Sequence, residues 1–153
     1  MKYDNVKVTF QEVPNEISLT ITISGCKNNC DGCHSPHLRE DIGDELNLIV
    51  FDHLINKHKY ITCVVFLGGD HKSAELIKLL LYARAKGLKT ALYSGNNYDQ
   101  IHTALLKNLD YVKVGRYEKE KGPLSSPTTN QIMLDLKTGE DITFMFWKGH
   151  EVT

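Results

Sequence analysis

The sequence has 153 residues, of which 41% are hydrophobic and 24% charged, and this composition is typical of one soluble globular domain. Its net charge is −1, so the overall charge does not favour binding to nucleic acid or to an anionic membrane. Three of the four cysteines lie within eight residues, which excludes the spread disulfide framework of a small secreted protein. The first residues do not resemble a signal peptide, and no segment has the ~20 apolar residues of a membrane span. We therefore expect a cytoplasmic protein with reduced thiols.

Two segments near the beginning of the chain alternate between apolar and polar residues. The pattern is strongest over residues 17–24, and a shorter alternation over residues 6–10 precedes it. Pro14 and Asn15 between the two segments favour a turn. The sequence thus predicts an antiparallel pair of strands at the edge of a sheet. Residues 25–37 have no periodicity, which predicts a loop at the carboxyl end of the second strand.

A helical period follows this loop. The predicted helix begins near Asp44 and Glu45, and its spacing is set by Leu46, Ile49, Val50, His53 and Leu54. Residues 61–67 are then continuously apolar, which is typical of a strand that is covered on both faces in a parallel sheet. The fourth cysteine, Cys63, lies in this run, and we expect it to be a buried and unreactive thiol.

The middle of the chain alternates between strands and helices. A helix is predicted over residues 73–87, with Ser73 as its N-cap and Gly87 as its stop. Strands are predicted over residues 88–94 and 110–114. The helix between these two strands carries Ile101, Ala104 and Leu105.

This alternation predicts βαβ units, a mainly parallel sheet and a single domain over residues 1–153. Residues 117–130 are polar and predict an exposed loop, and residues 131–136 and 142–147 predict a C-terminal β-hairpin. A complete (β/α)₈ barrel needs ~250 residues. The chain is therefore long enough for only part of such a barrel.

The cysteine cluster indicates a metal centre. Cys26, Cys30 and Cys33 place three thiolates on one short loop, whereas structural zinc usually takes four protein ligands in two separated pairs. A [4Fe–4S] cluster with three ligated irons and one open iron fits three thiolates. Two other interpretations stay open at this point: three free thiols, or zinc completed by His34 or His37.

The spacing Cys26-x-x-x-Cys30-x-x-Cys33 resembles the signature of the radical S-adenosylmethionine (SAM) enzymes. More narrowly, the chain resembles the activating proteins of the anaerobic ribonucleoside-triphosphate reductase. The small members of that family have about this length and often carry Asp-Gly-Cys-His around the third cysteine, as residues 31–34 do here. Comparable motifs follow in the same order at residues 68–70, 93–95 and 127–131. The resemblance therefore spans most of the chain.

The resemblance implies a partial, open β/α barrel of the radical SAM type, with one cluster held by the three clustered cysteines. The SAM contacts that it implies are Gly32, Cys33, His34, Gly68, Gly69, Asp70 and Ser94. Asp70 would accept hydrogen bonds from the amino group of SAM. The family more often has Glu at this position, which is longer by about 1.5 Å, so backbone carbonyls are the alternative partners. The alternatives without a ligand are an ordinary strand-to-helix turn for residues 68–70, a tight loop for Gly32 and a turn-capping role for Ser94.

The resemblance also implies an activity and its partners. The chain would generate a glycyl radical on the anaerobic ribonucleoside-triphosphate reductase, with electrons from a low-potential donor such as flavodoxin or ferredoxin. No side chain is assigned as a general acid or base, because hydrogen-atom abstraction needs none. The alternatives are activation of another glycyl-radical enzyme, modification of a small molecule, and, in a different class, a non-catalytic zinc-binding interaction module.

Overall fold

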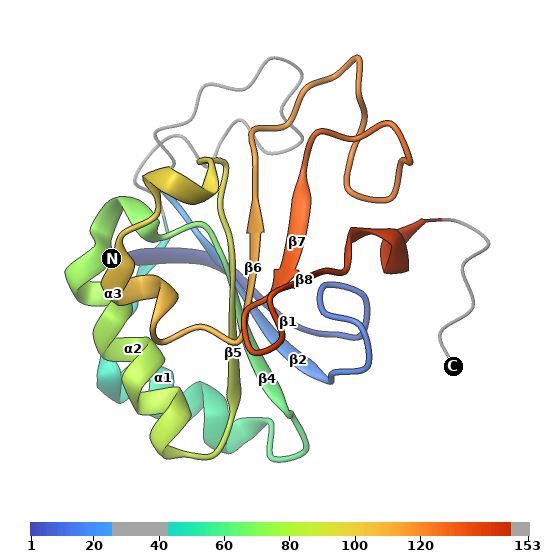
Figure 1. The fold of residues 1–153 in the computed structure, drawn as a ribbon. Helices are drawn as coiled ribbons and strands as arrows, with labels where there is room; N and C mark the ends of the chain where they lie inside the picture. The colour runs from blue at the N-terminus through green and yellow to red at the C-terminus, as the bar shows by residue number, and fades with distance from the viewer. Residues whose placement is uncertain (26–42, 148–153) are drawn as a thin grey trace.

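The computed structural model describes residues 1–25 and 43–147, and these residues build one sheet with the α-helices on one face (Figure 1). The strands are β1 (Lys2–Thr9), β2 (Ser18–Ile23), β3 (Asp44–Glu45), β4 (Cys63–Leu67), β5 (Lys89–Tyr93), β6 (Tyr111–Val114), β7 (Ile132–Asp135) and β8 (Glu140–Asp141). The α-helices are α1 (Leu48–Lys57), α2 (Ser73–Ala85) and α3 (Thr103–Leu106). Short 3₁₀ helices are η2 (Asp70–Lys72), η3 (Tyr98–Gln100) and η4 (Thr143–Phe146). No helix in the described part of the chain is long and apolar enough to cross a membrane.

The strands follow the order β3-β1-β2-β4-β5-β6-β7-β8. Parallel pairing joins β2, β4, β5 and β6 at the centre, and antiparallel pairing adds β1 and β3 on one side and β7 and β8 on the other. The predicted parallel strands are confirmed, but they form only the centre of a mixed and open sheet. That this sheet is a partial barrel of the radical SAM type stays a prediction.

The predicted antiparallel pair is confirmed as β1 and β2, but it does not lie at the sheet edge. The two-residue strand β3 pairs with the outer side of β1, through Lys2 with Glu45 and Tyr3 with Asp44. The sequence pattern contained no sign of β3, because two exposed acidic residues have no periodicity. The helix predicted to begin at Asp44 and Glu45 therefore begins later.

Helix α1 begins after Asn47, whose side chain accepts a hydrogen bond from the backbone N–H of Val50 at 2.9 Å. The buried face of α1 consists of Phe51 and Ile55. The predicted face was wrong at Ile49, which is 82% exposed, and at His53, which is also exposed. The error arises because the helix begins at Leu48, later than predicted. Leu46 is buried in the core but lies before the helix, so it does not mark the buried face of α1.

The prediction for α2 was correct in its span and partly wrong in its first turn. Ser73 is the first helical residue rather than the N-cap, and its hydroxyl donates to the carbonyl of Asp70 at 2.8 Å. The 3₁₀ turn η2 precedes it and leads directly into α2. At the other end, Gly87 takes a φ of +80° and ends the helix, as predicted.

The predicted C-terminal hairpin is only half correct. Strand β7 lies in the first predicted strand, but its partner β8 is formed by the two residues before the second predicted strand. Residues 142–147 leave the sheet, and Thr143–Phe146 form η4. Thr143 explains the departure, because its hydroxyl accepts the N–H of Met133 at 2.9 Å and so replaces a backbone ladder bond. The same hydroxyl donates to the carboxylate of Asp141.

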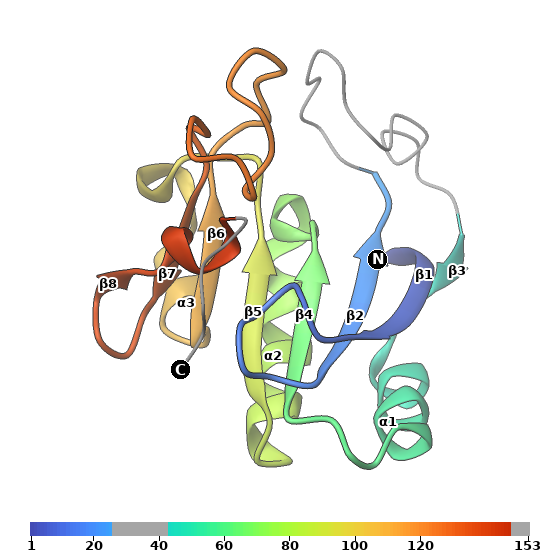
Figure 2. The same cartoon turned by 90° about the vertical axis from the view of Figure 1, so that its right-hand side faces the viewer.

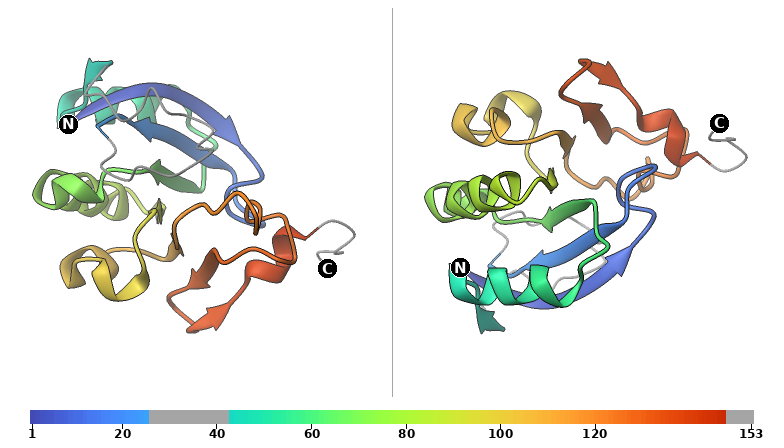
Figure 3. Two further views of the ribbon diagram at one scale, coloured as in Figure 1. Left: turned by 90° about the horizontal axis from the view of Figure 1, so that it is seen from above. Right: turned by 90° about the horizontal axis from the view of Figure 1, so that it is seen from below.

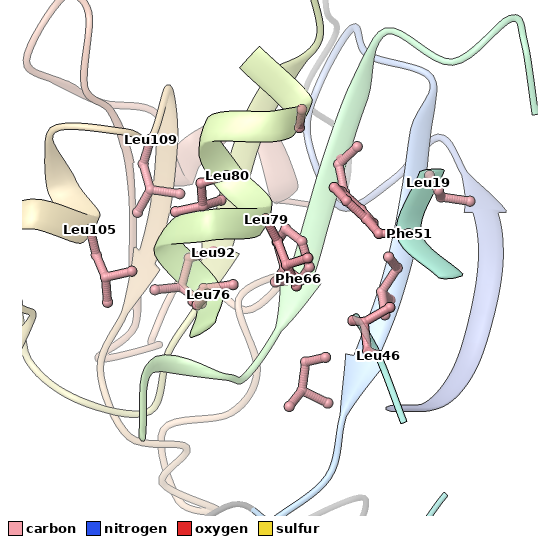
Figure 4. Close-up of a cluster of buried hydrophobic side chains, with 14 of the residues drawn as sticks. Leu19, Leu46, Phe51, Phe66, Leu76, Leu79, Leu80, Leu92, Leu105 and Leu109 are labelled. Atoms are coloured by element: carbon pink, nitrogen blue, oxygen red, sulfur yellow. The ribbon is translucent and has the colours of Figure 1, made fainter. Parts of the chain in front are cut away.

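Two hydrophobic cores lie on opposite faces of the sheet. The larger one packs the helices against the sheet and includes Phe51, Phe66, Leu76 and Leu92 (Figure 4). The second core, which we call the inner core, lies on the other face and consists of Val13, Cys63, Val65, Ala91, Leu124, Met133 and Ile142. The loop between β1 and β2 and the helix η4 lie side by side over this face (Figure 3). Strand β4 is thus covered on both faces, as its sequence predicts.

Asp110 joins several elements at the amino end of the parallel strands. Its carboxylate is 5% exposed and accepts the backbone N–H of Thr90 at 2.9 Å and the guanidinium of Arg84 at 3.2 Å. Lys137 lies 3.8 Å from the other carboxylate oxygen.

We expect Asp110→Ala to lower the free energy of unfolding by about 3 kcal/mol, because it leaves a buried N–H and a cation without their partner. Urea denaturation checks this, with the exposed Asp99→Ala as the control; equal stability of both variants would contradict it.

The Cys63 thiol of the inner core predicts a pH dependence. Burial, with a smaller contribution from Glu16, raises the pKa of Cys63 from 9.0 to about 12. The folded state therefore keeps the proton between pH 9 and 12 while the unfolded state releases it, so this contribution to stability is complete below pH 9 and declines above it. We expect wild-type protein to lose stability relative to Cys63→Ala above about pH 9, by at most about 1.4 kcal/mol per pH unit. Chemical denaturation at several pH values measures this, and parallel curves for both proteins would refute it.

Candidate functional site

The candidate site lies at the edge of the sheet where the four parallel strands end (Figure 2). Because β2, β4, β5 and β6 run in one direction, the chain leaves each of them at this edge. We call it the carboxyl edge. Three of the exits are described in full: residues 68–70 after β4, residues 94–96 after β5, and Gly115 after β6.

Gly68 and Gly69 form a tight turn after β4. Their φ values are +87° and +108°, a region that favours glycine. The N–H of Gly68 donates to the carbonyl of Tyr93 at 2.9 Å, which ties the turn to β5. A Cβ on Gly69 would lie 3.4 Å from both the Ile23 side chain and the sulfur of Met1, so the turn packs closely on β2. These glycines lead the chain from β4 to Asp70 at the carboxyl edge.

The structure brings Asp70 and Ser94 together, as their places at two strand ends predict. Ser94 is 1% exposed, and its hydroxyl donates to Oδ2 of Asp70 at 2.6 Å. The side-chain amide of Asn96 donates to the same oxygen at 2.8 Å. The backbone N–H of Asn96 also donates to the Ser94 hydroxyl at 3.0 Å. We call Asp70, Ser94 and Asn96 the carboxylate triad.

Asn96 was missed from the sequence, where it was assigned only to the turn after β5. A signal was present, because Asn96 and Ser94 are two residues apart at the end of a strand. A serine hydroxyl often accepts the backbone N–H two residues later, as Ser94 does from Asn96. Gly95 and Asn96 form a bend after β5 that is tied to β6: Ser94 N–H donates to the Lys113 carbonyl at 2.8 Å, and Gly115 N–H donates to the Asn96 carbonyl at 2.8 Å. These bonds continue the pairing of β5 with β6 and fix the triad on a rigid frame.

Lys113 is a second residue that the sequence did not single out. It is 8% exposed on the inner face of β6, and its ammonium donates to the Gly115 carbonyl at 3.2 Å. The ammonium also lies 5.8 Å from the centre of the Tyr93 ring. The Tyr93 hydroxyl donates to the carbonyl of Glu12, and burial raises the pKa of Tyr93. The sequence contained a signal for Lys113, because a lysine between two valines of a predicted strand is unusual.

The cysteine segment is located through the residues on either side of it. Cys26, Cys30, Cys33, Gly32 and His34 lie outside the described residues. Before the segment, Ile23 at the end of β2 pairs with Tyr3 of β1. After it, Asp44 of β3 pairs with Tyr3 from the other side. Both flanks are therefore bound to β1, and the chain enters the segment from the carboxyl edge, beside the Gly68 turn.

Cys63 lies away from this edge. It is fully buried at the beginning of β4, in the inner core. This confirms the prediction of a buried thiol. Among residues 1–25 and 43–147, no group of His, Cys, Asp and Glu side chains is arranged to hold a metal ion.

Comparison with known proteins identifies the family. Residues 17–134, more than half of the chain, match the family described as "4Fe-4S single cluster domain". The match includes the cysteine segment and the carboxylate triad. No curated protein and no solved structure matches the chain. The chain therefore belongs to the 4Fe-4S single cluster domain family and is an iron–sulfur protein.

Proposed function

We propose that this protein is a radical SAM activase, which uses one [4Fe–4S] cluster and SAM to generate a glycyl radical on the anaerobic ribonucleoside-triphosphate reductase. The observation that carries the proposal is the position of Asp70. Its carboxylate lies at the carboxyl edge, where the cysteine segment of an iron–sulfur protein begins. An anionic acceptor beside a cluster suits a ligand that carries an amino group and binds the open iron.

The donor set fits a cluster of this type. Three thiolates from Cys26, Cys30 and Cys33 would hold three irons and leave the fourth iron to a ligand. Cys63 is separated from them by its burial in the inner core. We assign the three clustered cysteines as the cluster ligands.

The described part of the edge also fits SAM. Both hydrogen bonds to Asp70 come from neutral groups, so they orient the carboxylate without neutralising it. Gly68 is half-buried and has no side chain that would keep a ligand from its backbone, while Gly69 is buried against Ile23 and Met1 and holds the turn in place. We assign Gly68, Gly69, Asp70 and Ser94 to SAM binding, together with Gly32, Cys33 and His34.

When bound, the cluster would supply one electron to the sulfonium of SAM, which would break its bond to C5′ and leave methionine and a 5′-deoxyadenosyl radical. That radical would take the hydrogen atom from a glycine and become 5′-deoxyadenosine. The chain's own contribution is to bind, to orient and to exclude water. Asp70 accepts N–H groups of the ligand, and the glycine turn allows close approach. No side chain needs to act as a general acid or base, and a low-potential flavodoxin or ferredoxin would provide the electrons.

Anaerobic reconstitution tests the ligand assignment. We expect about four irons and four sulfides per chain in the wild-type protein, because one cluster is bound. Cys26→Ala, Cys30→Ala and Cys33→Ala should each lose most of this iron, whereas Cys63→Ala is the matched control and should keep it. Iron and sulfide analysis with visible absorption measures the result. Stoichiometric zinc without a brown chromophore would favour the zinc-binding module instead.

Electron paramagnetic resonance tests the activity. When the cluster-loaded protein, SAM and a reductant are mixed with the anaerobic reductase, we expect the doublet signal of a glycyl radical on the reductase. Omission of SAM, or use of Cys30→Ala, should abolish the signal, because either change removes the source of the radical. SAM cleavage without a doublet would rule out this reductase as the partner and favour another glycyl-radical enzyme or a small molecule.

A further inference from the structure

The carboxylate triad has a directional hydrogen-bond pattern. The Ser94 hydroxyl has one proton, which it donates to Asp70, and its oxygen accepts the backbone N–H of Asn96. The Asn96 amide then donates to the same carboxylate oxygen. Each donor is therefore directed at Oδ2 of Asp70.

This pattern distinguishes the two oxygens of Asp70. A carboxylate offers about four acceptor positions, and both described bonds use Oδ2. No donor among residues 1–25 and 43–147 is found on Oδ1. Oδ1 is thus the carboxylate oxygen that is left to a ligand.

The short side chain makes this orientation important. An aspartate carboxylate is about 1.5 Å closer to the backbone than a glutamate carboxylate, so it reaches a ligand only from a suitable rotamer. Asn96 is well placed to select that rotamer, because its carbonyl accepts the N–H of Gly115 and its own N–H is bound by Ser94. Its amide is therefore held between the ends of β5 and β6.

We propose that Asn96 is a positioning residue. Its amide binds Oδ2 of Asp70 and so holds the carboxylate in the orientation in which Oδ1 accepts an N–H from the amino group of the ligand. This inference rests on the proposed function, because the ligand is SAM. It assigns to Asn96 a role in recognising the amino-acid part of the ligand, with no direct contact to the nucleoside.

Two ligands distinguish a role in recognising the amino group from a general role in holding the site together. S-adenosylhomocysteine carries the amino group, whereas 5′-methylthioadenosine keeps the nucleoside and lacks the amino acid. Anaerobic calorimetry on the cluster-loaded protein measures the binding of both. We expect Asn96→Ala to weaken binding of S-adenosylhomocysteine about tenfold and to leave binding of 5′-methylthioadenosine unchanged. Asn97→Ala is the matched control, since the Asn97 side chain caps η3 and does not contact Asp70, and it should bind both ligands like the wild type.

A double-mutant cycle tests whether Asn96 acts through Asp70. In the Asp70→Asn background, Asn96→Ala should cause no further loss of S-adenosylhomocysteine binding. Ser94→Ala removes the other donor to Asp70 with little change in volume. It should likewise weaken binding of S-adenosylhomocysteine more than binding of 5′-methylthioadenosine, which keeps the test available even if Asn96→Ala is unstable.

The possible results separate the two proposals. If the wild-type protein does not bind S-adenosylhomocysteine, the proposed function and this inference both fail. If the wild type binds it and Asn96→Ala binds both ligands normally, the proposed function stands and the positioning role is wrong. The positioning role would also be wrong if Asn96→Ala weakened the binding of both ligands equally. It would be wrong as well if Asn96→Ala weakened S-adenosylhomocysteine binding as much in the Asp70→Asn background as in the wild type.

Discussion

Parallel pairing of β2, β4, β5 and β6 directs the chain to the same edge of the sheet four times. Residues that are distant in sequence meet there for this reason alone. Asp70 and Ser94 are separated by helix α2, yet the pairing of β4 with β5 places them within hydrogen-bond distance. The same constraint places the end of β2, which the cysteine segment follows in the chain, beside the Gly68 turn. The carboxylate triad and the proposed position of the cluster thus both depend on this parallel pairing.

The inner face explains how this edge is kept rigid. Cys63, Val65 and Met133 fill the inner core, and the loop between β1 and β2 closes it together with η4. Lys113 and Tyr93 lie between this apolar region and the carboxyl edge, where their polar atoms are satisfied by backbone carbonyls. The inner core thus packs against β4 and β5, the same strands whose ends carry the carboxylate triad.

Most regular elements were predictable, because their periodicity reflects burial. Strand β4 is apolar on both faces and is covered on both, and Gly87 ends α2 as its lack of a side chain suggests. The errors occur where single hydrogen bonds override a pattern: Asn47 delays the start of α1, and Thr143 takes the place of a ladder bond and turns the last segment into η4. The pairing of Ser94 with Asp70 followed from topology, whereas the contribution of Asn96 depends on side-chain geometry, which no periodicity encodes.

The central claim is that the cluster lies at the carboxyl edge, beside Asp70. Nitroxide labels at two exposed positions test it directly: Ser125→Cys lies in the segment between β6 and β7 at this edge, and Lys59→Cys precedes β4 at the opposite edge. In the cluster-loaded protein, pulsed electron paramagnetic resonance measures how strongly the reduced cluster shortens the relaxation time of each label. We predict strong relaxation enhancement at position 125 and little at position 59. Equal enhancement at both positions, or stronger enhancement at position 59, would contradict the account.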